Sequence, residues 1–263
     1  MDGDGRANFI DSDYDGDGLG DEIEVAGGSD LNLVTPVISS LNPPTARESA
    51  PGTITVHGSN FQPGFTVAFG ADSPTPFNVT PTSFQVTLGP QPIGPASIVV
   101  TNPNGEADQA PYSFHGRRVF LSATTNGNIG GVAGGDALCA AGAATLGLTG
   151  TFLAWLGDAT TSPAARFSQT GGFSRVDGTK IADSWADLTD GTLDAPVSGG
   201  GGGVVWTGVE ADGTAEPPSC SNWTTSVSGT QGLRGISVQS GAQWTWSSAF
   251  GCNFVAPLYC FEQ

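Results

Sequence analysis

The sequence predicts a mainly β protein in three parts: an acidic N-terminal segment, a β-sandwich, and a larger α+β domain with two disulfides. The 263 residues include 40 glycines and 18 prolines, together with many serines and threonines. This composition favours short strands joined by turns over helical bundles. All six tryptophans and all four cysteines lie beyond residue 116, so the C-terminal part is a separate folding unit. We therefore expect the three parts at residues 1–30, 35–116 and 117–263.

Charge and hydrophobicity exclude several classes of partner. Acidic residues outnumber basic ones 25 to 8, which gives a net charge of −17. This excess disfavours phosphate backbones and anionic membranes, so we expect no nucleic-acid partner. The sequence has no apolar run of about 18 residues, so we expect no membrane insertion. Because no signal peptide opens the chain, we interpret Met1 as the start of a fragment whose signal peptide would lie upstream.

The N-terminal segment contains a loop with the spacing of a calcium site. Oxygen ligands at loop positions one, three, five, seven, nine and twelve, with glycine at six, suit a hard cation that takes about six to eight oxygens. Leu19 would contribute its backbone carbonyl, and Glu24 would close the site with both carboxylate oxygens. A truncated copy without position one precedes this loop. The predicted ligands are Asp13, Asp15, Asp17, Leu19, Asp21 and Glu24 in the complete loop, and Asp2, Asp4, Arg6, Asn8 and Asp11 in the truncated one.

The tandem arrangement of these loops, over about residues 2–25, resembles thrombospondin type 3 repeats. The resemblance implies a stalk that bound Ca²⁺ stiffens, with the cation in a structural role. The alternative is a solvated, disordered acidic tail. Without the cation, repulsion among the carboxylates should keep the segment unfolded.

Residues 35–116 have the pattern of a β-sandwich. Short runs of alternating apolar and polar residues, at 53–57, 66–69, 83–88 and 96–101, are separated by glycine or proline turns. Alternation marks half-buried strands, and its repetition over this length predicts an immunoglobulin-like sandwich. The predicted core consists of Ile54, Val56, Val67, Phe69, Phe84, Val86, Ile98 and Val100.

Three motifs in the same segment resemble the IPT/TIG family. They are Pro36-Val-Ile-Ser-Ser-Leu-Asn-Pro-Pro44, Gly58-Ser-Asn-Phe61 and Val100-Thr-Asn-Pro-Asn-Gly105. Some relatives of this fold contact DNA, but Arg47 is the single arginine or lysine of this segment. We therefore expect a spacer role.

The four cysteines indicate an oxidising environment. No CxxC pair points to zinc or redox chemistry, so two disulfides in an extracellular or cell-surface protein are the simplest interpretation. Four buried free thiols are the alternative. A helix is predicted over residues 136–145, whose small side chains allow close packing and which include Cys139, and a shorter one over residues 163–167.

Five motifs in residues 117–263 carry a second resemblance. They look like a DUF1554-type bacterial surface family of the C-type-lectin-like superfamily and, more distantly, like endostatin domains. The resemblance implies two nested disulfides, Cys139 with Cys260 and Cys220 with Cys252. With the single lysine, Lys180, the family resemblances favour a bacterial source. The motifs are Gly150-Thr-Phe-Leu-Ala-Trp-Leu156, Ser184-Trp-Ala-Asp-Leu188, Val205-Trp-Thr-Gly208, Cys220-Ser-Asn-Trp223 and Leu258-Tyr-Cys-Phe-Glu262.

Aromatic and amide side chains of this domain are the candidate ligand contacts. Trp244 and Trp246 alternate, which would place both on one face of a strand or loop, either stacked on a ligand or buried. Calcium-mediated sugar binding is disfavoured because Glu216-Pro-Pro218 departs from the superfamily's Glu-Pro-Asn. Zinc is disfavoured because residues 117–263 contain no histidine. Core positions are predicted for Trp155, Trp185 and Trp206, and ligand contacts for Trp244, Trp246, Asn222 and Trp223.

Catalysis is not expected. Both histidines lie outside residues 117–263, no Gly-x-Ser-x-Gly elbow occurs, and acids such as Asp183, Asp187 and Asp194 stand in turn-like contexts typical of solvated surface. The sequence therefore favours a non-enzymatic extracellular surface protein whose C-terminal domain binds a glycan or protein ligand. The alternative is a subunit of a calcium-dependent surface fibre in which the partner is another copy of the chain.

Overall fold

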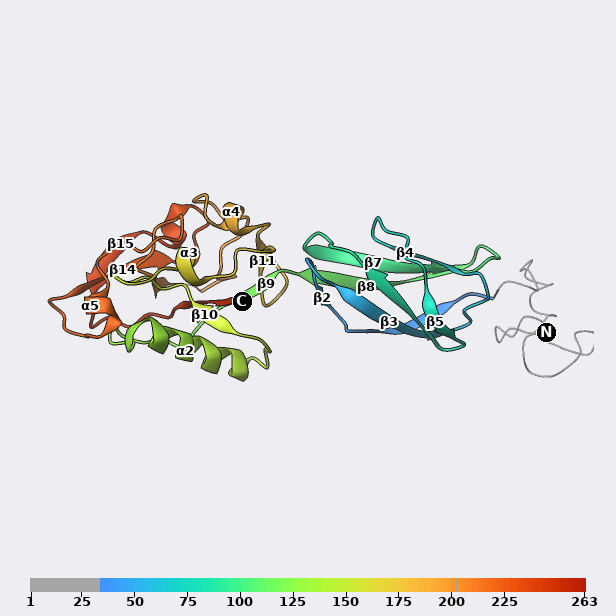
Figure 1. Ribbon diagram of the computed structural model, residues 1–263, viewed down its shortest axis with the longest axis horizontal. Coiled ribbons are helices and arrows are strands. Elements are labelled where there is room, and N and C mark those ends of the chain that lie inside the picture. Colours follow the sequence, from blue (N-terminus) through green and yellow to red (C-terminus); the bar gives the residue numbers. More distant parts are fainter. Residues whose placement is uncertain (1–33, 202) are drawn as a thin grey trace, which may run out of the picture. The chain divides into compact units, whose positions relative to one another are not determined.

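The computed structural model describes residues 34–201 and 203–263 (Figure 1). Within them the protein is mainly β with few helices, and it forms two compact units that meet between Phe114 and His115. None of the described helices is long and apolar enough to cross a membrane. The calcium ligands predicted between residues 2 and 24 lie outside the described residues.

The N-terminal unit is a sandwich of two four-stranded sheets. On the long strands of both sheets, buried side chains alternate with exposed or partly exposed ones over part of the strand, as their sequences predict. The first sheet has the order β1 (Val37–Asn42), β3 (Gly52–Ser59), β6 (Ser83–Leu88) and β5 (Phe77–Thr80), and the second has the order β2 (Ala46–Arg47), β8 (Ala107–His115), β7 (Gly94–Thr101) and β4 (Thr66–Phe69).

The predicted core of this unit is confirmed. All eight of its apolar residues are buried, from Ile54 on β3 to Val100 on β7. Phe61 and Phe65 join them from the turn after β3 and pack against Phe84 at ring distances of 5.0 and 4.8 Å. Ring contacts of this kind fill the space between the two sheets.

The C-terminal unit is built on a five-stranded sheet. The first strand of the unit, β9, pairs with the last, β16, and only β11 runs parallel to its neighbour β9. The same unit contains a second sheet, which has three antiparallel strands. The five strands are, in order, β10 (Phe152–Ala154), β16 (Tyr259–Glu262), β9 (Arg117–Leu121), β11 (Phe173–Arg175) and β12 (Lys180–Ala182), and the three are β13 (Val204–Trp206), β14 (Gln231–Ile236) and β15 (Ser248–Gly251).

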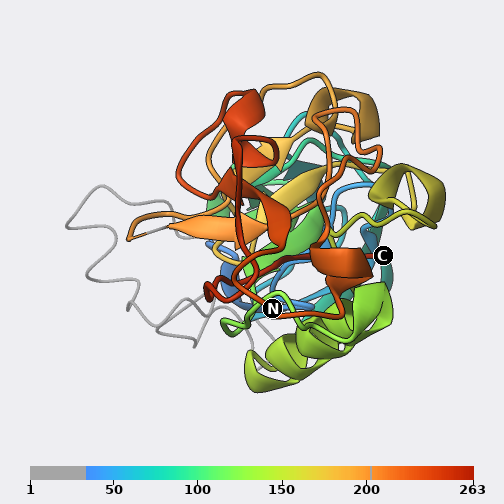
Figure 2. The same cartoon turned by 90° about the vertical axis from the view of Figure 1, so that its left-hand side faces the viewer.

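One long helix packs against this unit, α2 (Gly131–Thr145), drawn in light green in Figure 2. It begins five residues earlier than predicted, since the glycines before Asp136 lower helix propensity in the sequence. Glycines on both sides of Asp136 are needed for packing: a Cβ on Gly135 would lie 3.1 Å from the Ala154 Cβ, and one on Gly142 would lie 2.7 Å from the Phe120 ring. The helix can therefore approach the sheet closely. The remaining helices are the predicted α3 (Pro163–Arg166), then α4 (Trp185–Leu188), α5 (Cys220–Trp223) and the 3-10 helix η1 (Ala242–Trp244).

Two disulfides fasten the unit. Cys139 on α2 bonds Cys260 on β16, and Cys220 on α5 bonds Cys252 beyond β15. These are the pairs that the family resemblance implies. The outer bond ties the long helix to β16, the last strand of the chain, and the inner bond ties two loops together.

Ion pairs hold the same elements. Arg118 on β9 forms a forked ion pair with the buried Glu262 on β16, at 2.8 and 2.9 Å. Nη1 of Arg166 on α3 donates to both carboxylate oxygens of Asp136 on α2. The same carboxylate accepts the backbone N–H of Ala154 on β10. The forked Arg118–Glu262 pair fixes orientation as well as distance.

Candidate ligand-binding site

The short element α5 has an unusual backbone. Four consecutive residues without glycine, Cys220, Ser221, Asn222 and Trp223, have φ angles of 48, 54, 57 and 62°. They therefore form a left-handed turn, which costs an L-residue roughly 1–2 kcal/mol. Such a conformation persists only where surrounding contacts hold it, and it is concentrated at functional sites.

Several contacts hold this turn. The Trp223 indole is fully buried and donates a hydrogen bond from Nε1 to the Gly157 carbonyl at 2.7 Å. The Trp223 N–H donates to the Ser219 carbonyl at 2.6 Å, and the Trp223 carbonyl accepts the N–H of Gly130. The Cys220–Cys252 bond fixes the other end of the turn. A side chain at Gly232 would meet both the Cys220 sulfur and the Trp223 ring, so glycine is required behind the turn.

The turn supports a pocket of about 250 Å³. Its connections are polar: Asn222 Oδ1 accepts the N–H of Ala159 at 3.2 Å, and Ser219 Oγ accepts the N–H of Asn222 at 3.3 Å. The left-handed turn thus joins the two loops that form the walls. The pocket is lined by Asp158, Ala159, Ala215, Glu216, Pro217 and Ser219.

The carboxylates of this region differ in their surroundings. Asp158 Oδ1 accepts hydrogen bonds from the hydroxyl and N–H of Thr160 and from the N–H of Thr161. Burial acts to raise the pKa of Asp158, but these hydrogen bonds and the charge of Arg166 together hold it below its ordinary value. For Glu210 the direction is opposite, because partial burial and then the like charges of Glu216 and Asp212 raise its pKa. The negative charges here are therefore incompletely compensated.

Exposed apolar side chains lie next to the turn. Val227, Phe254 and Val255 are 60, 52 and 64% exposed. Phe254 stacks edge-on against Phe250 at 5.1 Å, and the Arg234 guanidinium lies 3.5 Å from the centre of the Phe250 ring. We call residues 157–161, 215–230 and 251–256 the loop end, since the Cys220–Cys252 bond and the hydrogen bonds of Trp223 and Cys252 join them.

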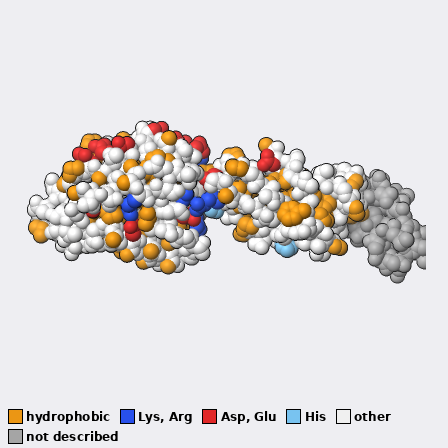
Figure 3. All heavy atoms as spheres, in the orientation of Figure 1, with side chains coloured by type: hydrophobic (Ala, Val, Ile, Leu, Met, Phe, Trp, Pro, Cys, Tyr) orange, Lys and Arg blue, Asp and Glu red, His pale blue; other side chains and the backbone are white. Residues whose placement is uncertain are grey.

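The loop end contains a stretch without ionisable side chains. Residues 224–233 and 248–257 carry none. In the view of Figure 3, the left-hand tip of the C-terminal unit is apolar or uncharged, while acidic side chains gather further in along one edge. A partner at this tip would therefore meet apolar contacts first.

Two of the four predicted ligand contacts need correction. Trp223 and Trp244 are fully buried, so neither indole is available to an external ligand. Trp244 ends the 3-10 helix η1 and packs against Trp155 and Tyr259, whereas Trp246 is 45% exposed. Trp244 and Trp246 were expected on one face of a strand or loop, but they do not share a face because the 3-10 helix turns the backbone here. Asn222 is exposed and lies beside the pocket.

The predicted core tryptophans are placed as expected. Trp155 and Trp206 are buried, and Trp185 is partly buried against Trp155 at a ring distance of 5.8 Å. The sequence did not identify Asp158 or Glu216 as pocket residues, and Glu216 entered only as the first residue of Glu216-Pro-Pro218, which departs from the superfamily's Glu-Pro-Asn. The available signal was the position of Glu216, four residues before a cysteine of the family motif.

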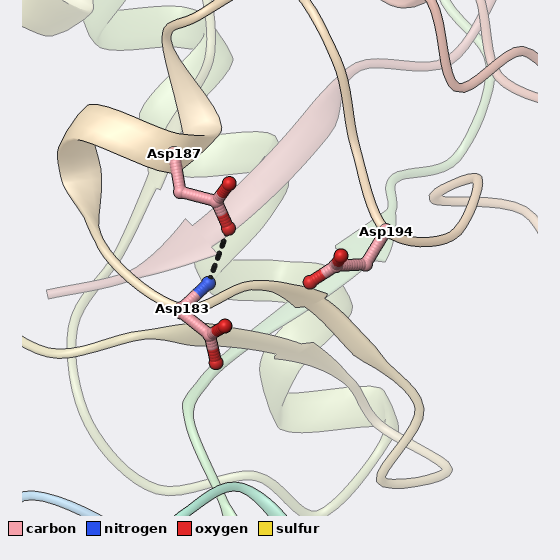
Figure 4. Close-up of side chains that lie close together, drawn as sticks. All are labelled: Asp183, Asp187 and Asp194. Carbon is pink, nitrogen blue, oxygen red and sulfur yellow. Dashed lines mark hydrogen bonds between the residues drawn. The ribbon is translucent and has the colours of Figure 1, made fainter.

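A second acidic cluster lies elsewhere in the unit, where Asp183, Asp187 and Asp194 bring their carboxylates within 4.8 Å of one another (Figure 4). Asp187 accepts the backbone N–H of Asp183 at 2.7 Å. The Lys180 ammonium contacts Asp183 at 2.7 Å and Asp194 at 3.0 Å. A lysine of the chain thus supplies the positive charge between these acids, which accords with their interpretation as surface residues.

Two protein-family models match the chain. The IPT/TIG domain matches residues 36–115, and the model described as "Protein of unknown function (DUF1554)" matches residues 122–240. The chain therefore carries an IPT/TIG domain followed by a DUF1554 domain, as its motifs indicate. No curated protein matches the chain.

Solved structures give distant likenesses to the first domain. The TIG domain of human nuclear factor of activated T-cells, cytoplasmic 4, is 18% identical over 31% of this chain and 89% of that one, with a TM-score of 0.27. CopC from Methylosinus trichosporium OB3b is 10% identical over 30% of this chain and 90% of that one, with a TM-score of 0.23. Neither likeness bears on the function of this chain.

The strain in the left-handed turn predicts a stabilising substitution. Ser221 is exposed, and its side chain makes no hydrogen bond among the described residues, so Ser221→Gly removes the steric penalty alone. We expect the free energy of unfolding to rise by about 1 kcal/mol, less than the full penalty because glycine loses more entropy on folding. Urea unfolding measures the change. Ser228→Gly, at a position without positive φ, is the control and should be neutral or destabilising; equal effects would contradict the strain.

The raised pKa of Glu210 predicts a pH-dependent effect. Its ionised form is disfavoured in the folded state, so at pH 7 Glu210→Gln should stabilise the protein by about 0.5 kcal/mol, the scale of an exposed charge pair. The gain should shrink as the pH falls through the raised pKa and vanish below 4.5, where the carboxyl becomes neutral in both states. Thermal unfolding at pH 7 and pH 4 measures it. Asp190→Asn is the control: hydrogen bonds from Thr192 lower the pKa of Asp190, so this change should not stabilise at pH 7.

Proposed function

We propose that this chain is a non-enzymatic extracellular surface protein whose C-terminal domain binds a glycan or protein ligand through the loop end. The observation that carries the proposal is the left-handed turn of residues 220–223, held rigid beside a pocket and a group of exposed apolar side chains. A rigid loop end loses little entropy when it binds, which favours recognition. The two disulfides fit a protein that folds in an oxidising compartment.

The other parts of the chain support this role. The calcium loops would stiffen a stalk, and the immunoglobulin-like domain would set the distance between stalk and recognition domain. A DUF1554 domain of the C-type-lectin-like superfamily would bring long loops suited to binding. The absence of histidine from residues 117–263 weighs against nucleophilic catalysis there.

Binding by the whole chain tests this proposal. We expect saturable binding to a member of a glycan or extracellular-protein panel, weakened at least about fivefold by Val255→Ser, because apolar contacts at an interface centre contribute more than about 1 kcal/mol. Surface plasmon resonance measures it. Val176→Ser, which alters a 44% exposed valine in the β11–β12 turn, is the matched control and should leave binding unchanged. Binding that ignores Val255, or no binding across the panels, would contradict the proposal.

A specific observation favours the fibre role as a second candidate. The two edges of the first sheet, β1 and β5, carry exposed apolar side chains: Val37 on one, and Phe77 and Val79 on the other. Unpaired edges with apolar side chains can pair with another chain. Such pairing would join copies of the chain laterally.

Light scattering in millimolar calcium and then in a chelator tests the fibre role. Extracellular calcium sites hold their ion at about 10⁻⁴–10⁻³ M, so a fibre should grow in calcium and dissociate in the chelator. Val79→Lys, which places a charge on the edge strand, should prevent growth. A monomer under both conditions would exclude this role.

A further inference from the structure

The walls of the loop-end pocket divide into two chemical kinds. Ala159, Ala215 and Pro217 provide apolar surface, while Asp158, Glu216 and Ser219 provide oxygen atoms. The volume of about 250 Å³ lies below the range of roughly 300–1,000 Å³ that is typical of small-molecule sites. A single side chain of a partner suits this size better than a whole metabolite or an oligosaccharide.

The oxygen atoms of the pocket are acceptors with free capacity. The Glu216 carboxylate accepts no hydrogen bond and joins no ion pair among the residues that the structure describes, and Asp158 accepts its hydrogen bonds at Oδ1 alone. Ser219 Oγ accepts one N–H, from Asn222. The neighbouring Arg166 is committed to both oxygens of Asp136. The pocket thus offers three acceptor groups and has no cation of its own in contact with Glu216.

The charges in the loop around the pocket are negative, like those of the pocket itself. Glu210 and Asp212 lie in the turn that the Val209–Ala215 bridge closes, and Glu216 directly follows it. Their mutual repulsion, after partial burial, raises the pKa of Glu210. The field at the pocket mouth therefore favours a cation over an anion or a neutral group.

We propose that this pocket binds a lysine side chain of a protein partner, with its ammonium between Asp158, Glu216 and Ser219 and its aliphatic stem against Ala159, Ala215 and Pro217. The inference rests on the proposed recognition role and names its ligand chemistry. Three acceptors match the three N–H groups of an ammonium, and a lysine stem buries well against apolar surface. Guanidinium is planar and broader, with five donors.

The rest of the loop end fits a protein around that lysine. Val227, Phe254 and Val255 offer exposed apolar contacts beside the charged pocket. Interfaces of this type combine an anchoring side chain in a pocket with apolar neighbours that exclude water. The net charge of −17 attracts basic proteins over long distances.

Titration of the whole chain with Nα-acetyl-lysine N-methylamide, whose side-chain ammonium is free, tests the inference. We expect saturable NMR shifts of the Ala159 and Ala215 amides with a Kd of about 1 mM, since one isolated group supplies the contacts. N-acetyl-norleucine methylamide, which has the stem without the charge, should produce no saturable shift. Glucosamine, which has an ammonium without the stem, should bind at least about fivefold more weakly, because it lacks the apolar contact.

Variants decide whether the pocket is responsible. Glu216→Gln should weaken lysine binding about fivefold, because it removes one carboxylate from the ammonium. Glu216 makes no hydrogen bond among the described residues, so the fold should be unaffected, which thermal unfolding checks. Glu106→Gln is the matched control in the other domain, where Thr35 can still donate to the amide oxygen.

Several outcomes would overturn the inference. Equal binding of the lysine and norleucine compounds would show that charge plays no part, and equal binding to wild type and Glu216→Gln would place the lysine elsewhere. Tight glucosamine binding would assign the pocket to amino sugars instead. If panel binding persists and depends on Val255 while lysine fails, the recognition role stands and the lysine assignment falls. If neither panel binding nor lysine binding is seen, both the recognition role and the lysine assignment are wrong.

Discussion

The buried indole of Trp223 is the contact on which the loop end depends. Its Nε1 hydrogen bond to the Gly157 carbonyl joins the loop after β10 to α5, and its burial holds four residues in a left-handed turn. The disulfide from Cys220 then fixes the segment around Cys252, from which Phe254 and Val255 project. One side chain and one covalent bond therefore position the pocket and the exposed apolar residues together.

The sheet and the loops of the C-terminal unit are stabilised differently. The sheet is held where the chain enters and leaves it, since β9 pairs with β16 and the Arg118–Glu262 ion pair joins the same two strands, while the Cys139–Cys260 bond ties β16 to α2. The loops have few strand hydrogen bonds and depend on separate anchors, each a buried tryptophan or a polar side chain. Thr245 is one such anchor, because its hydroxyl accepts the Trp155 Nε1 hydrogen bond and donates to the Val209 carbonyl.

Much of the fold could be predicted from the sequence, whereas little of the site could. Alternation identified the sandwich core because each strand buries one face, from Ile54 to Val100. The start of α2 was missed because Gly135 serves tertiary packing against Ala154, which local propensity does not register. The left-handed turn was missed because Cys-Ser-Asn-Trp contains no glycine to mark positive φ. Asp158 and Glu216 belong to separate loops, which the hydrogen bonds of Asn222 and Trp223 bring together.

The two acidic groups of the C-terminal domain illustrate how a site differs from a solvated surface. Asp183 and Asp194 share the Lys180 ammonium, and Asp187 accepts a backbone N–H, so that group is compensated within the chain. At the pocket, the nearest arginine is already bound by Asp136, and Glu216 retains its full acceptor capacity among the described residues. An uncompensated carboxylate beside a rigid apolar wall is therefore better explained by a cation that arrives from a partner.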